Sequence, residues 1–557
     1  MRIKRFTWLF LLPALLCACG ENPGGPDTPS YLSKVWSPDN GDGTYTNPVL
    51  HADYSDPDVC VVGEDYYLTA SSFNCVPGLP VLHSRDLVNW EIIGHALQRL
   101  PAEFDVPVHG GGVWAPSIRY HDGRFYIYWG DPDRGIFAVT AEDPAGRWSD
   151  AHCVVEGKGM IDPCPLWDED GRCYLVNAWA NSRVGFNSIL TVRELSEDGM
   201  TVKGDPRIVF DGGQDNHTAE GPKFYRKDGY YWIFCPAGGV KEGWQLAMRS
   251  SSVYGPYEAR TVLSQGSTDI HGPHQGAWVH TSRGEDWFLH FNDRYAYGRV
   301  VFLEPMVWKD AWPLIGEDPD GDGCGQPVLR HAKPLSDNAP VVNPAEDDEF
   351  SGILGLQWQW PANYDQSWGM PSADGYYRLY NCDLPSGNLW DAPNLLMQKL
   401  PAGEFVATAR MRIAAKCDGE YGGLAVMGRD WQALLAELDG GAFKLQLVSC
   451  TGADKGNPPS KLCVAVLKPS AEDSDSDYSP AKYLDIFMRI AVSGGRCRFG
   501  WSLDGEHFEA APGMPFTMKE GRWIGAKMGF VSEAEHRSGG KGWVDADWFR
   551  VCPGTSL

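Results

Sequence analysis

Three carboxylates, Asp56, Asp162 and Glu220, occupy equivalent positions in a sequence pattern that repeats along the chain. Each lies shortly before a polar turn that contains a glycine and leads into an aromatic, β-branched run, as in "HTAEGPKFYRKDGYYWIF" from residue 217. Carboxylates crowded into a partly dry site repel one another and lose solvation energy, so a purely structural role does not require them. Three carboxylates at equivalent positions of the repeat therefore indicate a role beyond the packing of the fold.

The repeated turns predict the fold that positions these carboxylates. Turn glycines occur five times, at intervals of 60, 48, 58 and 55 residues, and a four-stranded propeller blade needs roughly 40 to 50 residues plus insertions. We therefore predict an all-β fold with a five-bladed propeller. The first strand of each blade lines the central axis, so the residues that begin these strands converge on one funnel. The turn glycines are Gly63, Gly123, Gly171, Gly229 and Gly284, and the residues at the strand starts are Asp56, Trp114, Asp162, Glu220 and His274.

A second domain is expected because 557 residues exceed the size that one hydrophobic core usually supports. A stretch rich in Pro, Gly and Asp, from Trp312 to about Asp348, predicts a linker. Alternating segments beyond it, such as "EFVATARMRI" and "VDADWFRV", are typical of an antiparallel β-sandwich. The predicted organisation is a signal peptide at 1–18, a flexible tether at 19–44, the propeller at 45–330, a linker at 331–346 and the sandwich at 347–557.

The N-terminus "MRIKRFTWLFLLPALLCACG" combines basic residues with an apolar run too short to span a bilayer comfortably, which indicates an export signal. Within it, "LCAC" resembles a bacterial lipobox, whose last cysteine, here Cys19, becomes the lipidated first residue of the mature protein. We expect a protein that is lipid-anchored to the bacterial envelope, in the periplasm or at the cell surface, and that meets the membrane only through this anchor. An ordinary secretory signal is the alternative.

The composition argues against several classes of function. A formal net charge of −25 argues against a nucleic-acid partner. The 15 cysteines form no C-x-x-C pair, which argues against a zinc site and against a dense disulfide framework. The aromatic content of 12%, with 23 Trp, suits sugar faces as well as blade packing.

Longer stretches of the chain resemble glycoside hydrolase family 43, exported five-bladed propellers that act on arabinose- and xylose-containing plant polysaccharides. The similar segments run in the family's order from about residue 45 to 330, and the remainder resembles the concanavalin-like sandwich of one branch of the family. They include "NPVLHADYSDPDV", "GGGVWAPSIRYHDGRFYIYW", "GMIDPCPLWDEDGRCYLV", "HTAEGPKFYRKDGYYWIF" and "YGRVVFLEPMVWKDAWPLIG". The set as a whole is specific, whereas "SDP" or "AEGP" alone is not.

The resemblance implies an inverting mechanism with three carboxylates. Asp56 is then the general base that activates water, Glu220 the general acid that protonates the leaving oxygen, and Asp162 the residue that orients the acid and raises its pKa. Inversion needs a water between the base and the sugar, which sets the two carboxyl groups roughly 6.5 to 9.5 Å apart. Different blades across a funnel can supply such a gap.

One departure from the family concerns the base. Ser55 stands where the family often has proline, so the start of the strand could be looser here. This leaves Asp53 and Asp58 as alternatives to Asp56. Asp56 is favoured because it directly precedes a proline, as Asp162 does.

The resemblance also implies contacts with the sugar. Arg299 resembles an arginine that contacts sugar hydroxyls and the carboxylate of the acid, and an ion pair on the blade surface is the alternative. Phe73 and Trp114 resemble apolar walls of the first sugar subsite, with plain blade packing as the alternative.

No cofactor is expected to be required, but the resemblance implies two places for calcium. His274 resembles an axial histidine that helps to hold a hydrated calcium or sodium ion in many members, and a hydrogen-bonded core histidine is the alternative. Asp347, Glu349 and Asp547 lie at the two ends of the sandwich, where related sandwiches sometimes bind calcium. The acids of "EDPDGDG" from residue 317 lack a closing glutamate and are interpreted as a solvated turn.

The implied function is that of an exo-acting α-L-arabinofuranosidase or β-xylosidase that removes single pentoses from hemicellulose or pectin side chains. A retaining fructosidase is one alternative, but it typically pairs Asn-Asp-Pro-Asn with Glu-Cys-Pro, where this chain has "YSDPD" and "AEGP". A non-catalytic surface glycan-binding protein is another, and it would not need three carboxylates at the axis. The choice between the two pentoses depends on loop shape, which motifs do not encode.

Overall fold

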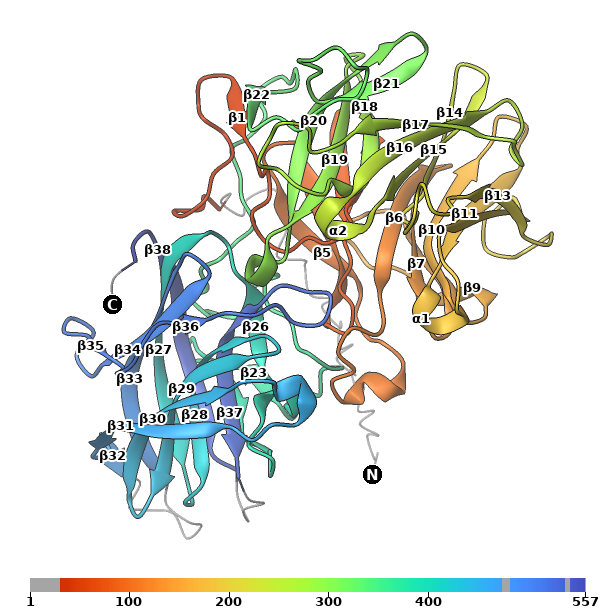
Figure 1. Ribbon diagram of the computed structural model, residues 1–557. Helices are drawn as coiled ribbons and strands as arrows, with labels where there is room; N and C mark the ends of the chain where they lie inside the picture. The colour runs from red at the N-terminus through yellow and green to blue at the C-terminus, as the bar shows by residue number, and fades with distance from the viewer. Residues whose placement is uncertain (1–30, 473–480, 536–540, 556) are drawn as a thin grey trace, which may run out of the picture.

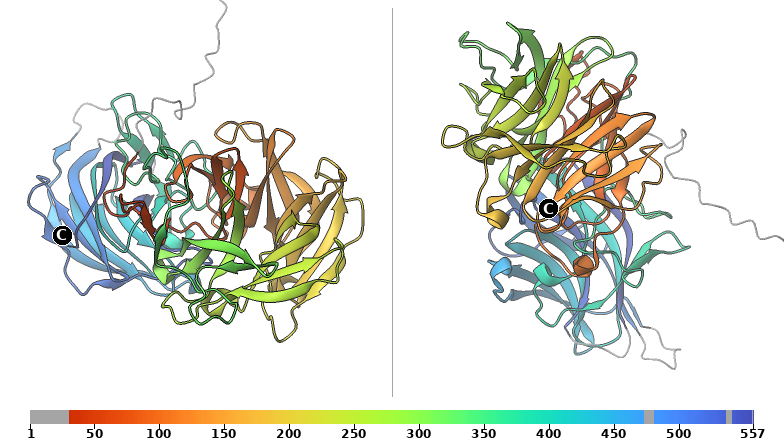
Figure 2. Two further views of the ribbon diagram at one scale, coloured as in Figure 1. Left: turned by 90° about the horizontal axis from the view of Figure 1, so that it is seen from above. Right: turned by 90° about the vertical axis from the view of Figure 1, so that its right-hand side faces the viewer.

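The computed structural model describes residues 31–472, 481–535, 541–555 and 557. The fold is all-β, a five-bladed propeller followed by a two-sheet sandwich, which confirms the predicted fold class. The two domains lie side by side (Figures 1 and 2). Across the described ranges, no helix is both long and apolar enough to cross a membrane. The predicted signal peptide at 1–18 and the predicted lipidation site Cys19 lie outside the described residues.

Each propeller blade is a four-stranded antiparallel sheet. The five predicted turn glycines each join the first two strands of a blade, and their φ angles lie between 65° and 81°, in the region that favours glycine. The blades are β2 (Asp58–Val62), β3 (Asp65–Thr69), β4 (Gly78–Ser84) and β5 (Glu91–Leu97); β6 (Trp114–His121), β7 (Arg124–Asp131), β8 (Gly135–Ala141) and β9 (His152–Glu156); β10 (Met160–Trp167), β11 (Cys173–Trp179), β12 (Ile189–Leu195) and β13 (Arg207–Asp211); β14 (Lys223–Lys227), β15 (Tyr230–Ala237), β16 (Trp244–Ser250) and β17 (Glu258–Leu263); and β18 (His274–His280), β19 (Asp286–Asp293), β20 (Arg299–Lys309) and β21 (Trp312–Ile315).

The fourth strand of blade five extends the propeller into the stretch predicted as a linker. Residues Trp312–Ile315 form β21, which pairs with the end of β20. Four residues are too few to show the alternation of apolar and polar residues that predicts a strand. Pro313 is tolerated in β21 because β21 is the edge strand of its sheet. The prediction that the linker begins at Trp312 is therefore wrong.

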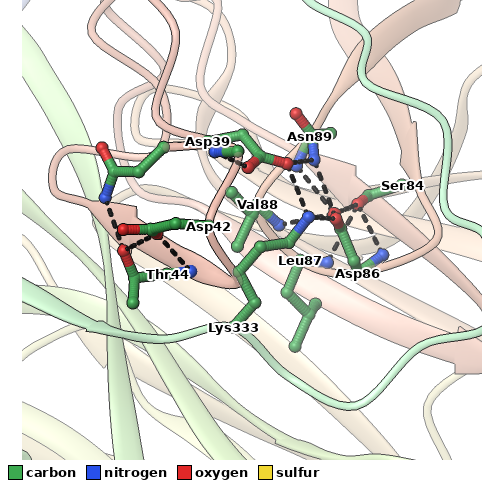
Figure 3. A network of polar contacts seen from close by, with 11 residues as sticks. Asp39, Asp42, Thr44, Ser84, Asp86, Leu87, Val88, Asn89 and Lys333 are labelled. Carbon is green, nitrogen blue, oxygen red and sulfur yellow. Dashed lines mark hydrogen bonds and ion pairs between the residues drawn. The ribbon is translucent and has the colours of Figure 1, made fainter.

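The two ends of the propeller sequence are joined to each other. β1 (Thr44–Thr46) pairs with β22 (Arg330–Ala332). Directly after β22, the ammonium group of Lys333 lies 2.6 Å from a carboxylate oxygen of Asp39 and 2.7 Å from one of Asp86 (Figure 3). Asp86 is fully buried and also accepts two backbone N–H groups of its own turn. Charge-assisted hydrogen bonds are stronger than neutral ones, so they hold the start of the linker on blade one.

The sandwich consists of a nine-stranded and a seven-stranded sheet, with buried side chains of both forming the core between them. The nine-stranded sheet contains β23 (Gly369–Pro371), β24 (Tyr377–Tyr380), β38 (Trp543–Cys552), β27 (Glu404–Ala415), β33 (Lys482–Ser493), β34 (Arg496–Ser502), β35 (Glu509–Ala510), β32 (Ala471–Glu472) and β36 (Phe516–Thr517). The seven-stranded sheet contains β25 (Cys382–Asp383), β37 (Lys527–Ala534), β28 (Glu420–Met427), β29 (Trp431–Asp439), β30 (Ala442–Cys450), β31 (Ser460–Leu467) and β26 (Leu396–Lys399).

The sandwich is packed directly onto the propeller. Val76 of the propeller exchanges two backbone hydrogen bonds, of 2.9 and 2.7 Å, with Trp360. The side chain of Asn363 bonds the backbone of Leu100 through both its oxygen and its nitrogen. Buried polar groups are costly to leave unpaired, so these bonds fix one domain against the other.

Residues 31–44 fall in the segment expected to be a tether, and the structure packs them against both domains. The hydroxyl of Ser33 donates to the carboxylate of Glu346 at 2.9 Å. The indole N–H of Trp36 donates to the carbonyl of Pro48 at 3.0 Å. Ser33 and Glu346 are far apart in the sequence, and composition gave no sign of either contact.

Candidate active site

The three predicted carboxylates come from the starts of the first strands of three different blades. Asp56 lies two residues before β2, Asp162 is the third residue of β10, and Glu220 lies three residues before β14. Asp56 and Asp162 both have φ angles of 56°, in the left-handed region that side chains rarely adopt, and such positions persist where the surroundings hold the backbone. The negative charge of Asp56 acts on both of the other carboxyl groups, so the three share one site.

Asp56 is held by one cation and two hydroxyl groups. Nη1 of Arg299, the first residue of β20, lies 3.1 Å from Oδ1 and 3.3 Å from Oδ2 of Asp56. The hydroxyls of Ser55 and Ser71 donate to Oδ2 at 2.8 and 2.6 Å. The guanidinium of Arg299 also lies over Phe291, 4.8 Å from the ring centroid. These donors fix the position of the Asp56 carboxylate, and a general base must be aligned with the proton that it removes.

The predicted contact of Arg299 with the acid is not found among the described residues. Its Nη1 donates to Ser55 at 2.7 Å and to Asp56. The backbone explains the difference, because Tyr54 N donates to Arg299 O at 3.1 Å and so places the start of β20 beside the segment that carries Asp56.

Asp162 holds the backbone next to Glu220. Its side chain is buried, and Oδ2 accepts the backbone N–H of Gly221 at 2.7 Å. The amide of Gln275 approaches the same oxygen at 3.5 Å. Burial, and then the charge of Asp56, raises the pKa of Asp162. Asp162 therefore acts on Glu220 through both geometry and charge.

Glu220 is the carboxyl group best suited to keep a proton. Burial first, and then the charges of Asp162 and Asp56, raises its pKa, while Arg299 opposes the shift. Its side chain keeps 26% exposure, so it can still reach a bound molecule. Oε1 lies 3.4 Å from Nε2 of His274, and burial lowers the pKa of that imidazole to about 3, so it is neutral.

The two alternatives to Asp56 are engaged elsewhere. Asp53 accepts the backbone N–H groups of Arg299 and Gly525 at 2.8 and 2.9 Å. Asp58 is fully buried, and its Oδ2 accepts the N–H of Ile118 at 2.8 Å and Nη1 of Arg119 at 2.6 Å. Both alternatives therefore accept backbone N–H groups, whereas the donors to Asp56 are side chains, which favours Asp56 as the group with a catalytic role.

The predicted apolar walls lie next to each other, and the structure adds a third aromatic side chain. Phe73 is buried and meets Trp114 edge-on, with 6.3 Å between ring centroids. Trp523, from a turn of the sandwich, lies 6.0 Å from Trp114 and is 47% exposed. The guanidinium of Arg183 lies 5.7 Å from the Trp114 ring. No propeller motif could have identified Trp523, because it belongs to the other domain.

The turn that carries Trp523 contacts two loops of the propeller, the one before β6 of blade two and the one before β20 of blade five. At one end, a Cβ on Gly110 would lie 2.7 Å from Cγ of Arg522. At the other end, a Cβ on Gly525 would lie 2.8 Å from N of Gly298, so only glycine fits there. Blade one, which carries Asp56, lies between these two blades in the ring.

The predicted calcium residues do not form one group of ligands. Asp347 receives the ammonium of Lys34 at 2.8 Å, Glu349 pairs with Arg550 at 2.7 Å, and Asp547 pairs with Arg410 at 2.7 Å. Among the described residues, the clustered acidic ligand atoms are those of Asp318, Asp320 and Asp322 on the turn after β21. The ring nitrogens of His274 have no hydrogen-bond partner in the described part of the chain, and a neutral imidazole with a free nitrogen suits a cation ligand.

Both domains of the chain are similar to known proteins. Residues 45–313 match the model of Glycosyl hydrolases family 43, and residues 347–552 match the model of the Beta xylosidase C-terminal Concanavalin A-like domain. A protein of Xylanibacter ruminicola described as a putative beta-xylosidase is 36% identical over 518 residues, which cover 91% of this chain and 89% of that protein. The non-reducing end alpha-L-arabinofuranosidase BoGH43B of Bacteroides ovatus is 33% identical over 427 residues, 71% of this chain and 77% of that protein.

A solved structure extends the comparison to the arrangement of both domains. The crystal structure of the GH43 BlXynB protein from Bacillus licheniformis has a TM-score of 0.76 and 26% identity, and covers 92% of this chain and 100% of its own. Fold and site together define a propeller-type glycoside hydrolase with a C-terminal sandwich. The chain belongs to glycoside hydrolase family 43.

Proposed function

We propose that this protein is an exo-acting, inverting hydrolase that releases terminal α-L-arabinofuranosyl or β-D-xylosyl residues from plant cell-wall polysaccharides, such as hemicellulose or pectin side chains. The observation that carries the proposal is the convergence of Asp56, Asp162 and Glu220. Arg299 and two serine hydroxyls hold Asp56, and burial together with neighbouring negative charge raises the pKa of Asp162 and of Glu220. The printed names of the relatives, a putative beta-xylosidase and a non-reducing end alpha-L-arabinofuranosidase, support a pentose as the sugar released.

In the proposed reaction, Asp56 accepts a proton from a water molecule as the water oxygen attacks the anomeric carbon. Glu220 gives its proton to the glycosidic oxygen, the bond between that oxygen and the anomeric carbon breaks, and exchange with solvent then restores both carboxyl groups. Because the displacement is single, the anomeric configuration inverts. Asp162 supports the acid by holding Gly221 and by its negative charge.

The exo mode, in which the enzyme acts on the end of a chain, is supported by the propeller loops on the side of blade one. There the Trp523 turn of the sandwich reaches from Gly110 to Gly298, and Trp523 lies against Trp114. A wall on this side leaves less room for a polymer to pass through the site in both directions. Binding of the chain end is then favoured over binding of an internal unit.

No cofactor takes part in this proposed bond cleavage. We also propose that His274 could hold a hydrated calcium or sodium ion, because its buried ring nitrogens lack partners in the described part of the chain.

Export with a lipid anchor at Cys19 is likewise proposed from the segment "LCAC". Fractionation of cells that express the full chain tests the anchor: Cys19→Ser should move the protein out of the membrane fraction.

The experiment that tests the function uses paired substrates and the first product. Nitrophenyl α-L-arabinofuranoside and nitrophenyl β-D-xyloside are hydrolysed by the purified protein, and proton NMR records the anomer released before mutarotation. We expect hydrolysis of at least one substrate, with inversion. A retained anomer, or transfer of the sugar to methanol, would contradict Asp56 as the base, and no turnover of either substrate would contradict the pentose assignment.

A further inference from the structure

The two oxygens of the Asp56 carboxylate have very different surroundings. Oδ2 receives the hydroxyls of Ser55 and Ser71, at 2.8 and 2.6 Å, and lies 3.3 Å from Nη1 of Arg299. Oδ1 has a single donor among the described residues, the same Nη1 at 3.1 Å. A carboxylate oxygen has two lone pairs. The lone pairs of Oδ2 are therefore used, and Oδ1 retains one.

Both hydroxyl protons are committed to Asp56 because each hydroxyl oxygen already accepts a hydrogen bond. Ser55 Oγ accepts Nη1 of Arg299 at 2.7 Å, and Ser71 Oγ accepts the backbone N–H of Ala115 at 2.8 Å. A hydroxyl has one proton to donate, and here the nearby acceptor is the carboxylate. The two serines are also linked to each other, since Ser71 N donates to Ser55 O at 2.8 Å.

We propose that Ser55 and Ser71 are positioning residues for the base: together they bind Oδ2 of Asp56 and leave Oδ1 as the atom that takes the proton from the attacking water. This inference rests on the proposed role of Asp56. Both serines are buried, with 1% and 3% exposure, so water does not replace them as donors. They fix the rotation of the carboxylate, and a base must be aligned with the proton that it removes.

Other charged groups act on the same carboxylate and stay in place when a serine is changed. Arg299 of β20 supplies the positive charge, Asp162 of β10 and Glu220 before β14 are the acidic neighbours, and His274 of β18 is neutral. Loss of a hydroxyl donor then leaves the cation and the acids unchanged. The remaining effect is weaker support for the charged form of Asp56.

Alanine variants of the two serines, with a third serine as a matched control, test the proposal. Ser55→Ala and Ser71→Ala should each lower kcat by about tenfold, because hydrogen bonds to charged groups are worth more than neutral ones. KM should stay within about twofold, and the acidic limb of the kcat/KM profile should move up by about half a pH unit. Ser72→Ala is the control, since Ser72 is also 3% exposed and binds Leu79 N instead of Asp56; it should lower Tm but leave the acidic limb in place.

The double variant Ser55→Ala/Ser71→Ala decides the outcome. A shift of its acidic limb beyond that of either single variant supports the proposal, whereas a lower Tm with an unchanged kcat and acidic limb overturns it and makes the serines merely structural. Failure of the underlying function looks different. In that case Asp56→Asn retains activity or the released anomer is retained, whatever the serine variants do.

Discussion

Asp53 joins the two domains at the edge of the candidate active site, where one of its carboxylate oxygens accepts Arg299 N at 2.8 Å and the other accepts Gly525 N at 2.9 Å. Arg299 in turn donates from its side chain to Asp56. One buried carboxylate thus connects the sandwich turn to the residue that holds the proposed base. The sandwich is therefore part of the site and not an appended module.

Asp53→Ala should weaken both the fold and the reaction. The change leaves two N–H groups without an acceptor, and each orphaned group costs about 1 to 3 kcal/mol. We expect a lower free energy of unfolding in urea and a lower kcat/KM. Asp485→Ala is the control, because Asp485 forms an exposed pair with Arg412 and such pairs contribute little. Asp53 would be unimportant if its variant matched this control in both measurements.

Trp523→Ala should act on substrate binding more than on chemistry. Loss of this partly exposed wall should raise KM for xylo-oligosaccharides several-fold, with kcat changed by less than about threefold, because no reacting atom is touched. Initial rates on short oligosaccharides measure both constants. The matched variant Trp548→Ala removes an indole that contacts Phe487 and Arg550 within the sandwich, and it should leave KM unchanged. If both variants raised KM by the same factor, Trp523 would not be a wall of the sugar site.

Asp162→Asn should move the basic limb of the pH profile to lower pH. The acid works in its protonated form, so activity falls as pH rises through the pKa of Glu220. Burial and the anions of Asp162 and Asp56 raise that pKa, and removal of the Asp162 charge makes the proton easier to lose. We expect kcat to fall by about tenfold or more, but by less than the factor of about 10² to 10⁴ that general acid catalysis as a whole contributes, because Glu220 is still present. An unmoved basic limb would exclude the electrostatic role of Asp162.

Variants of Asp58 and Asp56 should affect different properties, stability for Asp58 and turnover for Asp56. Asp58→Ala removes one partner of a buried ion pair with Arg119 and should cost about 3 to 5 kcal/mol of unfolding free energy. At a temperature where it is folded, this variant should keep a kcat near that of the unaltered protein. Asp56→Asn should do the reverse, with turnover abolished and stability changed less. Initial rates at saturating substrate and urea unfolding measure these two quantities, and an inactive but fully stable Asp58→Ala would reopen the choice of base.

Much of the site could be predicted from the sequence because the propeller repeats. Turn glycines at regular intervals predicted the five blades, and the positions before them predicted that Asp56, Asp162 and Glu220 converge at one axis. This works because blade geometry converts a sequence interval directly into a place on the funnel. The exception was β21, whose four residues were too short for a periodic signal.

What the sequence by itself determined was the class of fold, the family and the carboxylates at the strand starts, since these depend on local patterns and short-range turns. Only the tertiary structure decided which neighbours act on them. The Ser71 hydroxyl on Asp56, the bond from Asp53 to Gly525 and the Trp523 wall join residues that are far apart in the chain. Such contacts have no fixed sequence interval, because they depend on how one blade faces the next and on how the sandwich packs against the ring.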